Sequence, residues 1–152
     1  MSLSQQLSAV RSEHAALTIA PPCILVVEDD AMVSGLLYEI LEDMYQVICV
    51  AQSGEALLKL AHQRIDVILL DYGLPGGGAE EIAKRADQRG VPMIWMTGDP
   101  AAVRMLHADD HPLLVKPFSI SRVLGALTKV RLSERAFASR SLLGVQWGGD
   151  ES

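Results

Sequence analysis

Hydrophobic residues along the chain follow two alternating patterns from residue 23 onward. Short apolar runs, typical of strands buried on both faces of a sheet, alternate with longer segments whose apolar residues recur at helical spacing. The runs span residues 24–27, 47–51, 67–70, 92–96 and 113–115. Five strand-then-helix units in sequence predict an α/β fold, namely one doubly wound, five-stranded parallel sheet with right-handed crossovers and strand order 2-1-3-4-5.

The segments that follow the strands predict helices with one buried face each. The first carries the apolar stripe Met32, Val33, Leu36, Leu37, Ile40 and Leu41. The second carries Leu57, Leu60 and Ala61, with Ser53 as its N-cap. A shorter helix follows with Ile82, Ala83 and Ala86, and a weak one covers residues 101–106. The last is capped by Ser119 or Ser121 and buries Val123, Leu124, Leu127 and Val130.

The two ends of the chain stand apart from this alternation. Residues 1–22 form an N-terminal extension whose apolar positions would share one helical face: Leu3, Leu7, Val10, His14 and Leu17. The extension could be an accessory helix or a tail, since a helix this short must pack on something to persist. Residues 132–152 are too few for a further domain, so we expect a C-terminal tail without an output domain, and one domain at residues 23–131.

Composition and charge exclude several classes of protein. A chain of 152 residues that is 49% hydrophobic can build one core. Its net charge of −6 and the lack of a Lys/Arg cluster argue against direct nucleic-acid binding. No basic leader and no apolar run near the ~20 residues of a membrane span are present, so we expect a cytoplasmic protein without membrane contact. Cys23 and Cys49 lie in predicted buried strands without metal-ligand spacing, which favours a packing role.

Polar residues end four of the five predicted strands. Glu28 and Asp29 follow the first, Asp71 the third, Thr97 the fourth and Lys116 the fifth. The carboxyl ends of parallel strands meet at one edge of the sheet, which is where ligands bind in open α/β folds. We therefore expect these side chains to converge beside the crevice between the first and third strands.

A shared cation is the simplest way to hold several acids in such a crevice. Adjacent strands are about 4.8 Å apart, so Asp29 and Asp71 can share one ion. Without a cation, converging carboxylates would repel one another. A hard ion with oxygen ligands fits best, and Mg²⁺ is the first choice. Each residue also has an ordinary alternative: Asp29 or Asp30 could cap a helix, Asp71 or Thr97 could belong to a turn, and Lys116 could be a solvated loop charge.

The ordered set of motifs resembles the receiver domain of bacterial two-component response regulators. The resemblance covers about residues 23–131 and rests on four stretches: Val26-Val27-Glu28-Asp29-Asp30, Leu70-Asp71-Tyr72-Gly73-Leu74-Pro75, Met96-Thr97-Gly98 and Val115-Lys116-Pro117-Phe118. It implies the flavodoxin-like receiver fold, of the kind found in chemotaxis-type single-domain regulators. Each motif is weak when taken singly, but their order along the chain is specific.

The resemblance assigns a role to each strand-end residue. It implies that Asp71 is the phosphoacceptor, and that Asp29, Asp71 and the backbone carbonyl of Gly73 ligate Mg²⁺, with Glu28 acting through water. Thr97 would be the switch hydroxyl. Lys116 would pair with the phosphoryl group, placed by a cis peptide bond to Pro117. No other cofactor is implied.

Two departures from the family pattern affect signal output more than chemistry. The family usually has a segment ending in Asp-Gly after the proline, whereas this chain has Gly76, Gly77, Gly78 and Ala79. We expect this loop to be looser than usual. The family's switch aromatic is replaced by Leu113, so the Thr97–Leu113 switch should respond weakly, because the inward and outward rotamers of a small side chain differ less in packing energy.

The sequence therefore favours a stand-alone receiver that takes a phosphoryl group from a histidine kinase or phosphotransfer protein onto Asp71. It would signal through protein contacts with a downstream target, with a homodimer as an open alternative, and would not be a metabolic enzyme. One rival is a degenerate receiver that binds proteins independently of phosphate. A second is a Mg²⁺-dependent phosphohydrolase, but such enzymes commonly carry an acid two residues after the nucleophile, where this chain has Gly73.

Overall fold

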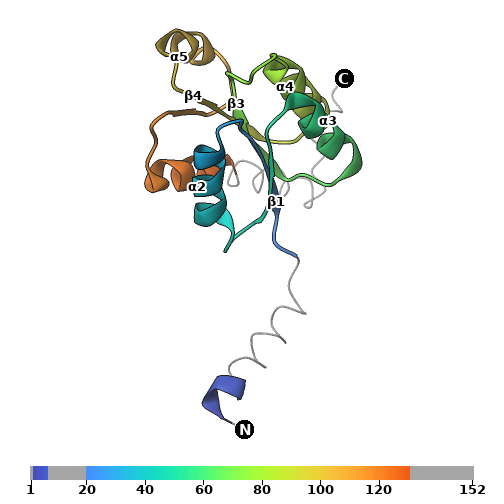
Figure 1. Ribbon diagram of the computed structural model, residues 1–152, viewed down its shortest axis with the longest axis vertical. Coiled ribbons are helices and arrows are strands. Elements are labelled where there is room, and N and C mark those ends of the chain that lie inside the picture. The colour runs from blue at the N-terminus through green and yellow to red at the C-terminus, as the bar shows by residue number, and fades with distance from the viewer. Residues whose placement is uncertain (1, 7–19, 131–152) are drawn as a thin grey trace, which may run out of the picture.

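Five parallel strands form the centre of the molecule (Figure 1). The computed structural model describes residues 2–6 and 20–130. Its strands are β1 (Cys23–Val27), β2 (Gln46–Val50), β3 (Val67–Asp71), β4 (Met93–Thr97) and β5 (Leu113–Val115). Their order across the sheet is β2-β1-β3-β4-β5, and all four neighbouring pairs are parallel. The predicted fold and strand order are confirmed.

Helices follow the strands as predicted. They are α2 (Ala31–Leu41), α3 (Ser53–His62), α4 (Ala79–Gln88) and α5 (Pro100–Leu106), and residues 120–130 are also helical. Of the predicted N-terminal helix, residues 3–6 are helical. The remaining positions of its apolar face, from Leu7 to Leu17, lie outside the described residues, as does the expected tail at residues 132–152. Within the described part of the chain, no helix has the length and apolar composition of a membrane span.

Two hydrophobic cores cover the two faces of the sheet. On one face, Leu25, Ile68 and Trp95 pack with buried side chains of α3, α4 and α5. On the other face, Ile24 and Leu69 pack with buried side chains of α2 and of the helix at residues 120–130. Every residue of β1, β3 and β4 is buried, because helices cover both faces of these central strands. The sheet can therefore place polar groups in a sheltered position only at its ends.

Two burial predictions are wrong at the margins of the sheet. Cys49 is exposed, because β2 is an edge strand that pairs with β1 alone. Met32 is 84% exposed and Leu36 is also exposed, so α2 buries Leu37 and Leu41 and not the full predicted stripe. Met32 lies in the first turn of α2, and the helix meets the core with its later turns. The two cysteines thus differ, since Cys23 is buried in the central strand β1.

Side-chain caps begin α2, α5 and the helix at residues 120–130, but not α3 or α4. The Asp30 carboxylate accepts hydrogen bonds from the backbone N–H groups of Met32 and Val33, and Ser119 Oγ accepts one from the N–H of Arg122. The prediction that Ser53 caps α3 is wrong, because Ser53 is already helical and Gln52 precedes it without a side-chain cap. The buried residues of α3 are Ala56 and Leu60, and the predicted Ala61 is exposed.

Three consecutive glycines connect β3 to α4 in left-handed backbone conformations. The φ angles of Gly76, Gly77 and Gly78 are 80°, 79° and 97°, values that L side chains rarely adopt. A Cβ at Gly78 would lie 2.5 Å from the Cβ and Oγ atoms of Ser53, whereas one at Gly77 would meet nothing within 4 Å. Gly78 thus lets the start of α4 lie directly against the start of α3. The looseness expected of this loop stays a prediction.

We expect Gly78→Ala to destabilise the protein more than Gly77→Ala. An alanine with positive φ costs about 1–2 kcal/mol, and this cost is common to both variants. Only Gly78→Ala adds an overlap with Ser53, which should cost roughly 1–3 kcal/mol more. Urea unfolding followed by circular dichroism measures the difference in the free energy of unfolding. An equal loss in the free energy of unfolding in the two variants would show that α3 and α4 can move apart without a free-energy cost.

Candidate functional site

Four strands deliver polar side chains to one edge of the sheet. Glu28 follows β1, Asp71 ends β3, Thr97 ends β4 and Lys116 follows β5. Among the described residues, the buried polar or charged ones are Glu28, Asp71 and Thr97. Burying such groups is costly unless they have partners, so their concentration at one edge indicates a functional site. The structure therefore brings together Glu28, Asp29, Asp71 and Lys116 as predicted, with Thr97 at the end of the neighbouring strand β4.

Three carboxylates form a cluster at this edge. Oxygen atoms of Glu28, Asp29 and Asp71 all lie within 4.8 Å of one another. Glu28 and Asp71 are buried, whereas Asp29 is exposed and opens the cluster to solvent. Carboxylate oxygens are the donors that Mg²⁺ prefers, and this ion usually keeps several waters. The donor set therefore fits Mg²⁺, with Asp29 on the side from which an ion and its waters would enter.

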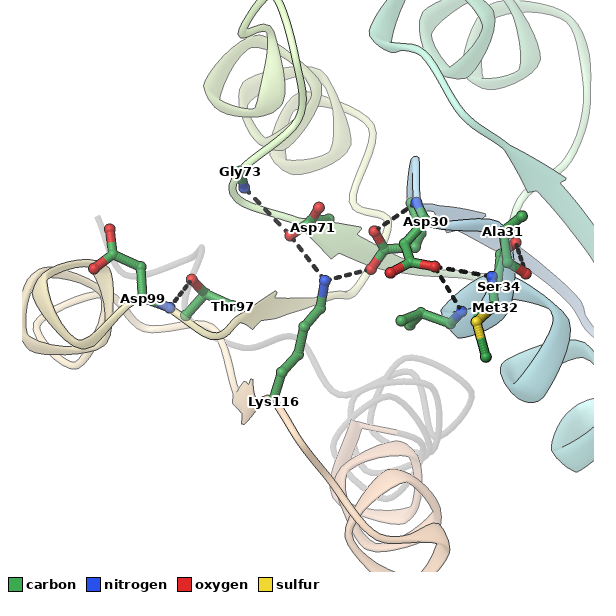
Figure 2. A network of polar contacts seen from close by, with 11 residues as sticks. Asp30, Ala31, Met32, Ser34, Asp71, Gly73, Thr97, Asp99 and Lys116 are labelled. Carbon is green, nitrogen blue, oxygen red and sulfur yellow. Dashed lines mark hydrogen bonds and ion pairs between the residues drawn. The ribbon is translucent and has the colours of Figure 1, made fainter.

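Lys116 connects two of these acids across the sheet. Its Nζ atom lies 2.5 Å from Glu28 Oε1 and 3.4 Å from Asp71 Oδ1. Figure 2 shows the side chain reaching from the end of β5 to Asp71. The peptide bond between Lys116 and Pro117 is cis, as the resemblance implied. Lys116 is therefore not a solvated loop charge, because its ammonium group is held between carboxylates.

Burial and ion pairing shift the pKa values at this pair in defined directions. Burial raises the pKa of the Glu28 carboxyl, and the charge of Asp71 adds to the increase, against the opposing effect of Lys116 and of the Asp30 N–H. Burial lowers the pKa of Lys116, but its contacts with Glu28 and Asp71 raise it by more. The ammonium group therefore stays charged, and a positive charge is fixed beside Asp71.

The Thr97 hydroxyl links the site to the start of α5. Thr97 Oγ1 accepts a hydrogen bond from the backbone N–H of Asp99 at 3.2 Å. Asp99 in turn caps α5 by accepting from the N–H of Ala101, with Pro100 at the first helical position. This contact uses an acceptor site of the hydroxyl, so the O–H group can still donate elsewhere. Figure 2 shows Thr97 and Asp99 on the β4 side of the site.

Asp99 was not among the residues predicted for the site, although the sequence held a signal for it. An acid directly before a proline is a common start of a helix, with the acid as N-cap and the proline at the first helical position. The structure also assigns Asp30 to the cap of α2, one of the ordinary roles considered above. Asp30 still contributes to the site, because its backbone N–H donates to Glu28 Oε2.

Gly73 lies close to Asp71, and Gly98 lies close to Lys116. The N–H of Gly73 donates to Asp71 Oδ1 at 3.3 Å, so the chain turns closely around the carboxylate. A Cβ at Gly98 would lie 3.4 Å from the Cβ of Lys116, which leaves little room for a larger residue. Leu113, the predicted partner of Thr97 in a switch, is half-buried beside Trp95 in β4. The roles of Gly73 and Leu113 stay predictions.

Comparison with known proteins identifies one family. The model of the response regulator receiver domain matches residues 24–128. The phosphate regulon transcriptional regulatory protein PhoB of Rhizobium meliloti is 32% identical to this chain over 111 residues, which cover 68% of this chain and 49% of the relative. The chain spans about half the length of the curated relatives it matches.

Solved receiver domains have the same fold. A response regulator receiver domain protein from Methanospirillum hungatei superposes with a TM-score of 0.67 at 27% identity, covering 77% of this chain and 99% of the other. The receiver domain of a sensor histidine kinase from Pseudomonas aeruginosa gives a TM-score of 0.64 at 29% identity, covering 73% and 98% of the two chains. The latter structure holds a magnesium ion coordinated in its active site cleft.

We expect Asp29→Asn to weaken Mg²⁺ binding by more than tenfold, which corresponds to about 1.4 kcal/mol or more. The reason is that one of few charged donors of the cluster is lost. Asp30→Asn is the matched control, because Asp30 is outside the cluster and asparagine preserves the helix cap. Isothermal titration with MgCl₂ measures both affinities. Equal affinities of Asp29→Asn and the wild type would count against the metal site.

Proposed function

We propose, from the premise that this chain belongs to the response regulator receiver domain family, that it accepts a phosphoryl group on the carboxylate of Asp71. The donor is a phosphohistidine on a sensor histidine kinase or on a histidine phosphotransfer protein. The observation that carries the proposal is the convergence of a buried carboxylate, a fixed ammonium group and an acidic cluster at one sheet edge. An ordinary turn aspartate would need none of these neighbours.

Phosphoryl transfer to Asp71 brings two anions together, so positive charge must offset their repulsion. An oxygen of Asp71 attacks phosphorus and forms an acyl phosphate, while the bond from phosphorus to the donor's imidazole nitrogen breaks and the electron pair stays on that nitrogen. Lys116, 3.4 Å from Asp71 Oδ1, is placed to pair with the phosphoryl oxygens. Its Glu28 contact fixes the ammonium group but does not remove its charge.

A bound Mg²⁺ would supply the remaining positive charge at the phosphoryl oxygens. The residues that would hold the ion are Asp29, Asp71 and the backbone carbonyl of Gly73, with Glu28 through a water. Asp29 suits an entering ion because it is exposed. Glu28 suits a water-mediated contact because one of its oxygens is already engaged by Lys116 and the other by the N–H of Asp30.

Thr97 and Leu113 are the proposed switch residues. The O–H of Thr97 can donate to a phosphoryl oxygen on Asp71. A shift of this hydroxyl would disturb its hydrogen bond with the N–H of Asp99, which is the N-cap of α5. Leu113 lies next to Trp95 in the sheet but has neither a ring nor a hydroxyl of its own. We therefore expect the response of β5 to be weaker than in receivers with an aromatic residue at this position.

The signal would pass to a downstream protein by direct contact. The transcriptional regulators among the relatives are about twice as long as the part this chain matches, so their role in transcription is not carried over. Residues 132–152 contain two basic residues, Arg135 and Arg140, which gives no electrostatic footprint for DNA. We therefore propose that the residues of this chain signal through protein contacts and do not themselves bind DNA. A homodimer and a phosphate-independent binding module are the alternatives.

Intact mass after incubation with acetyl phosphate and Mg²⁺ tests the proposal. We expect the wild type to gain the mass of one phosphoryl group, and Asp71→Asn, which keeps the size of the side chain, to gain none. The same reaction without Mg²⁺ should give little product, because repulsion between the two anions is then offset by Lys116 alone. A folded wild-type protein that gains no mass would support the phosphate-independent module, and an equal gain in Asp71→Asn would show that a residue other than Asp71 carries the phosphoryl group.

A further inference from the structure

His111 lies between two carboxylates on separate elements, away from the acidic cluster. Its Nδ1 atom is 2.5 Å from Asp109 Oδ1, and its Nε2 atom is 2.9 Å from Asp87 Oδ1. Asp87 belongs to the last turn of α4, whereas Asp109 and His111 belong to the loop between α5 and β5. The backbone N–H of His111 also donates to Asp109 Oδ1. The imidazole ring therefore ties this loop to α4.

Both contacts can exist together only when the ring is protonated. An ionised carboxylate accepts hydrogen bonds but donates none, and a neutral imidazole has a single N–H group. One of the two carboxylates would then face a nitrogen lone pair. Partial burial lowers the pKa of His111, but the hydrogen bonds and charges of Asp87 and Asp109 raise it by more, above its ordinary value of 6.5. The protonated ring, hydrogen-bonded to both carboxylates, therefore persists toward neutral pH.

The direction of the His111 pKa shift determines how the stability of the fold depends on pH. Because folding raises the pKa of His111, the contact stabilises the fold fully below about pH 6.5. The contribution is lost as the pH rises through the folded-state value. Both partners are partly exposed, with side-chain exposures of 58% for Asp87 and 31% for Asp109, so solvent reduces the stabilisation. The contact is therefore a reversible one.

Other charged groups around His111 are farther away. The ring lines two hollows, of about 760 and 530 Å³, and Asp87 lines both of them. Besides Asp87 and Asp109, the charged residues of these linings are Asp110 and Lys129 in the larger hollow and Glu80 and Lys84 in the smaller one. Asp87 and His111 thus line both hollows.

A chain of contacts leads from His111 to the residue next to the phosphoacceptor. Asp109 accepts from His111 with Oδ1 and from the indole N–H of Trp95 with Oδ2, at 3.2 Å. The edge of the buried Trp95 ring meets Tyr72, with ring centroids 5.4 Å apart and an interplanar angle of 74°. Tyr72 directly follows Asp71, and its hydroxyl contacts the sulfur of Met105 in α5.

We propose that His111 is a proton-dependent clasp that joins α4 to the loop before β5. Through Trp95 and Tyr72, this clasp is coupled to the occupancy of the site around Asp71. The coupling rests on the proposed function, whereas the clasp itself does not. A ligand at Asp71 must fit against the loop that contains Tyr72 and Gly73, and the closed clasp fixes that loop in one position. The protonated form therefore binds a phosphoryl mimic more tightly, and linkage requires that the mimic also favours protonation.

Proton NMR of the histidine ring signals tests the clasp and its coupling. Titrations of the full chain are run with Mg²⁺ alone and with Mg²⁺ and beryllofluoride, a phosphoryl mimic, and His111→Gln assigns the signal among the histidines. Without the mimic, we expect the His111 pKa to lie above 6.5, the ordinary value of a histidine. With it, we expect a further rise of about 0.3 to 1 unit, which corresponds to a two- to tenfold coupling.

Two variants of Tyr72 separate the coupling from the clasp. Tyr72→Leu removes the ring contact with Trp95, so the His111 pKa should stay raised but no longer respond to beryllofluoride. Tyr72→Phe keeps the ring and loses only the hydroxyl, so it should retain the response. The fluorine signal of the bound mimic measures the affinity for beryllofluoride at pH 6 and at pH 9. We expect the ratio of the affinity at pH 6 to that at pH 9 to be two- to tenfold larger in the wild type than in His111→Gln.

Each result decides between the ideas. An unraised His111 pKa in the free protein would overturn the clasp. Beryllofluoride that binds without changing the His111 pKa, or an equal response in Tyr72→Leu and Tyr72→Phe, would overturn the coupling and leave the phosphoacceptor intact. Beryllofluoride that does not bind at all would overturn the proposed function and the coupling together, whereas the raised pKa would still support the clasp.

Discussion

The balance of charge between Lys116 and the two buried carboxylates is the constraint on which the rest of the site depends. Glu28 follows β1 and Lys116 follows β5, so their contact crosses the ends of β3 and β4 that lie between them. These two residues are 88 positions apart in the chain. Because a buried charge without a partner costs several kcal/mol, the edge of the sheet is stable only when all of these strands are in place. Chemistry at Asp71 therefore presupposes the complete sheet.

The same edge is connected in two ways to one helical layer, that of α3, α4 and α5. Thr97 leads directly to the start of α5 through Asp99. Tyr72 leads through Trp95 into the core that α3, α4 and α5 share. Leu113 offers no aromatic ring at β5, but Trp95 supplies one on the neighbouring strand. An aromatic contact thus exists near the site in this protein, but it involves β4 and not β5.

The fold could be predicted from the sequence because its elements are encoded locally. Unbroken apolar runs such as residues 67–70 indicate central strands, and polar residues after them indicate the edge where the site lies. The placement of Asp71 and Lys116 followed from strand order alone. The exposure of Cys49 was missed, although the predicted order 2-1-3-4-5 already places its strand at the edge of the sheet.

The His111 contacts were beyond sequence reasoning for a different reason. Asp87 and His111 are 24 positions apart, and neither belongs to a recognisable motif. Their meeting depends on the path of the loop after α5, which no hydrophobic period describes. The chemical roles of Glu28, Asp29, Gly73 and Thr97 rest on the family and stay predictions, although the structure brings their elements together.

Complete burial of the central strands makes the polar strand ends responsible for alignment. Hydrophobic alternation normally prevents a strand from slipping by one residue, because a slip would turn apolar side chains toward water. In β3 both faces are covered, so a slip would leave apolar groups buried on either side. What opposes it is Asp66 before the strand, whose carboxylate accepts from the N–H of Cys23, and Asp71 at its end. A one-residue slip would draw one of these acids into the core, so Asp71 also helps to hold its own strand in register.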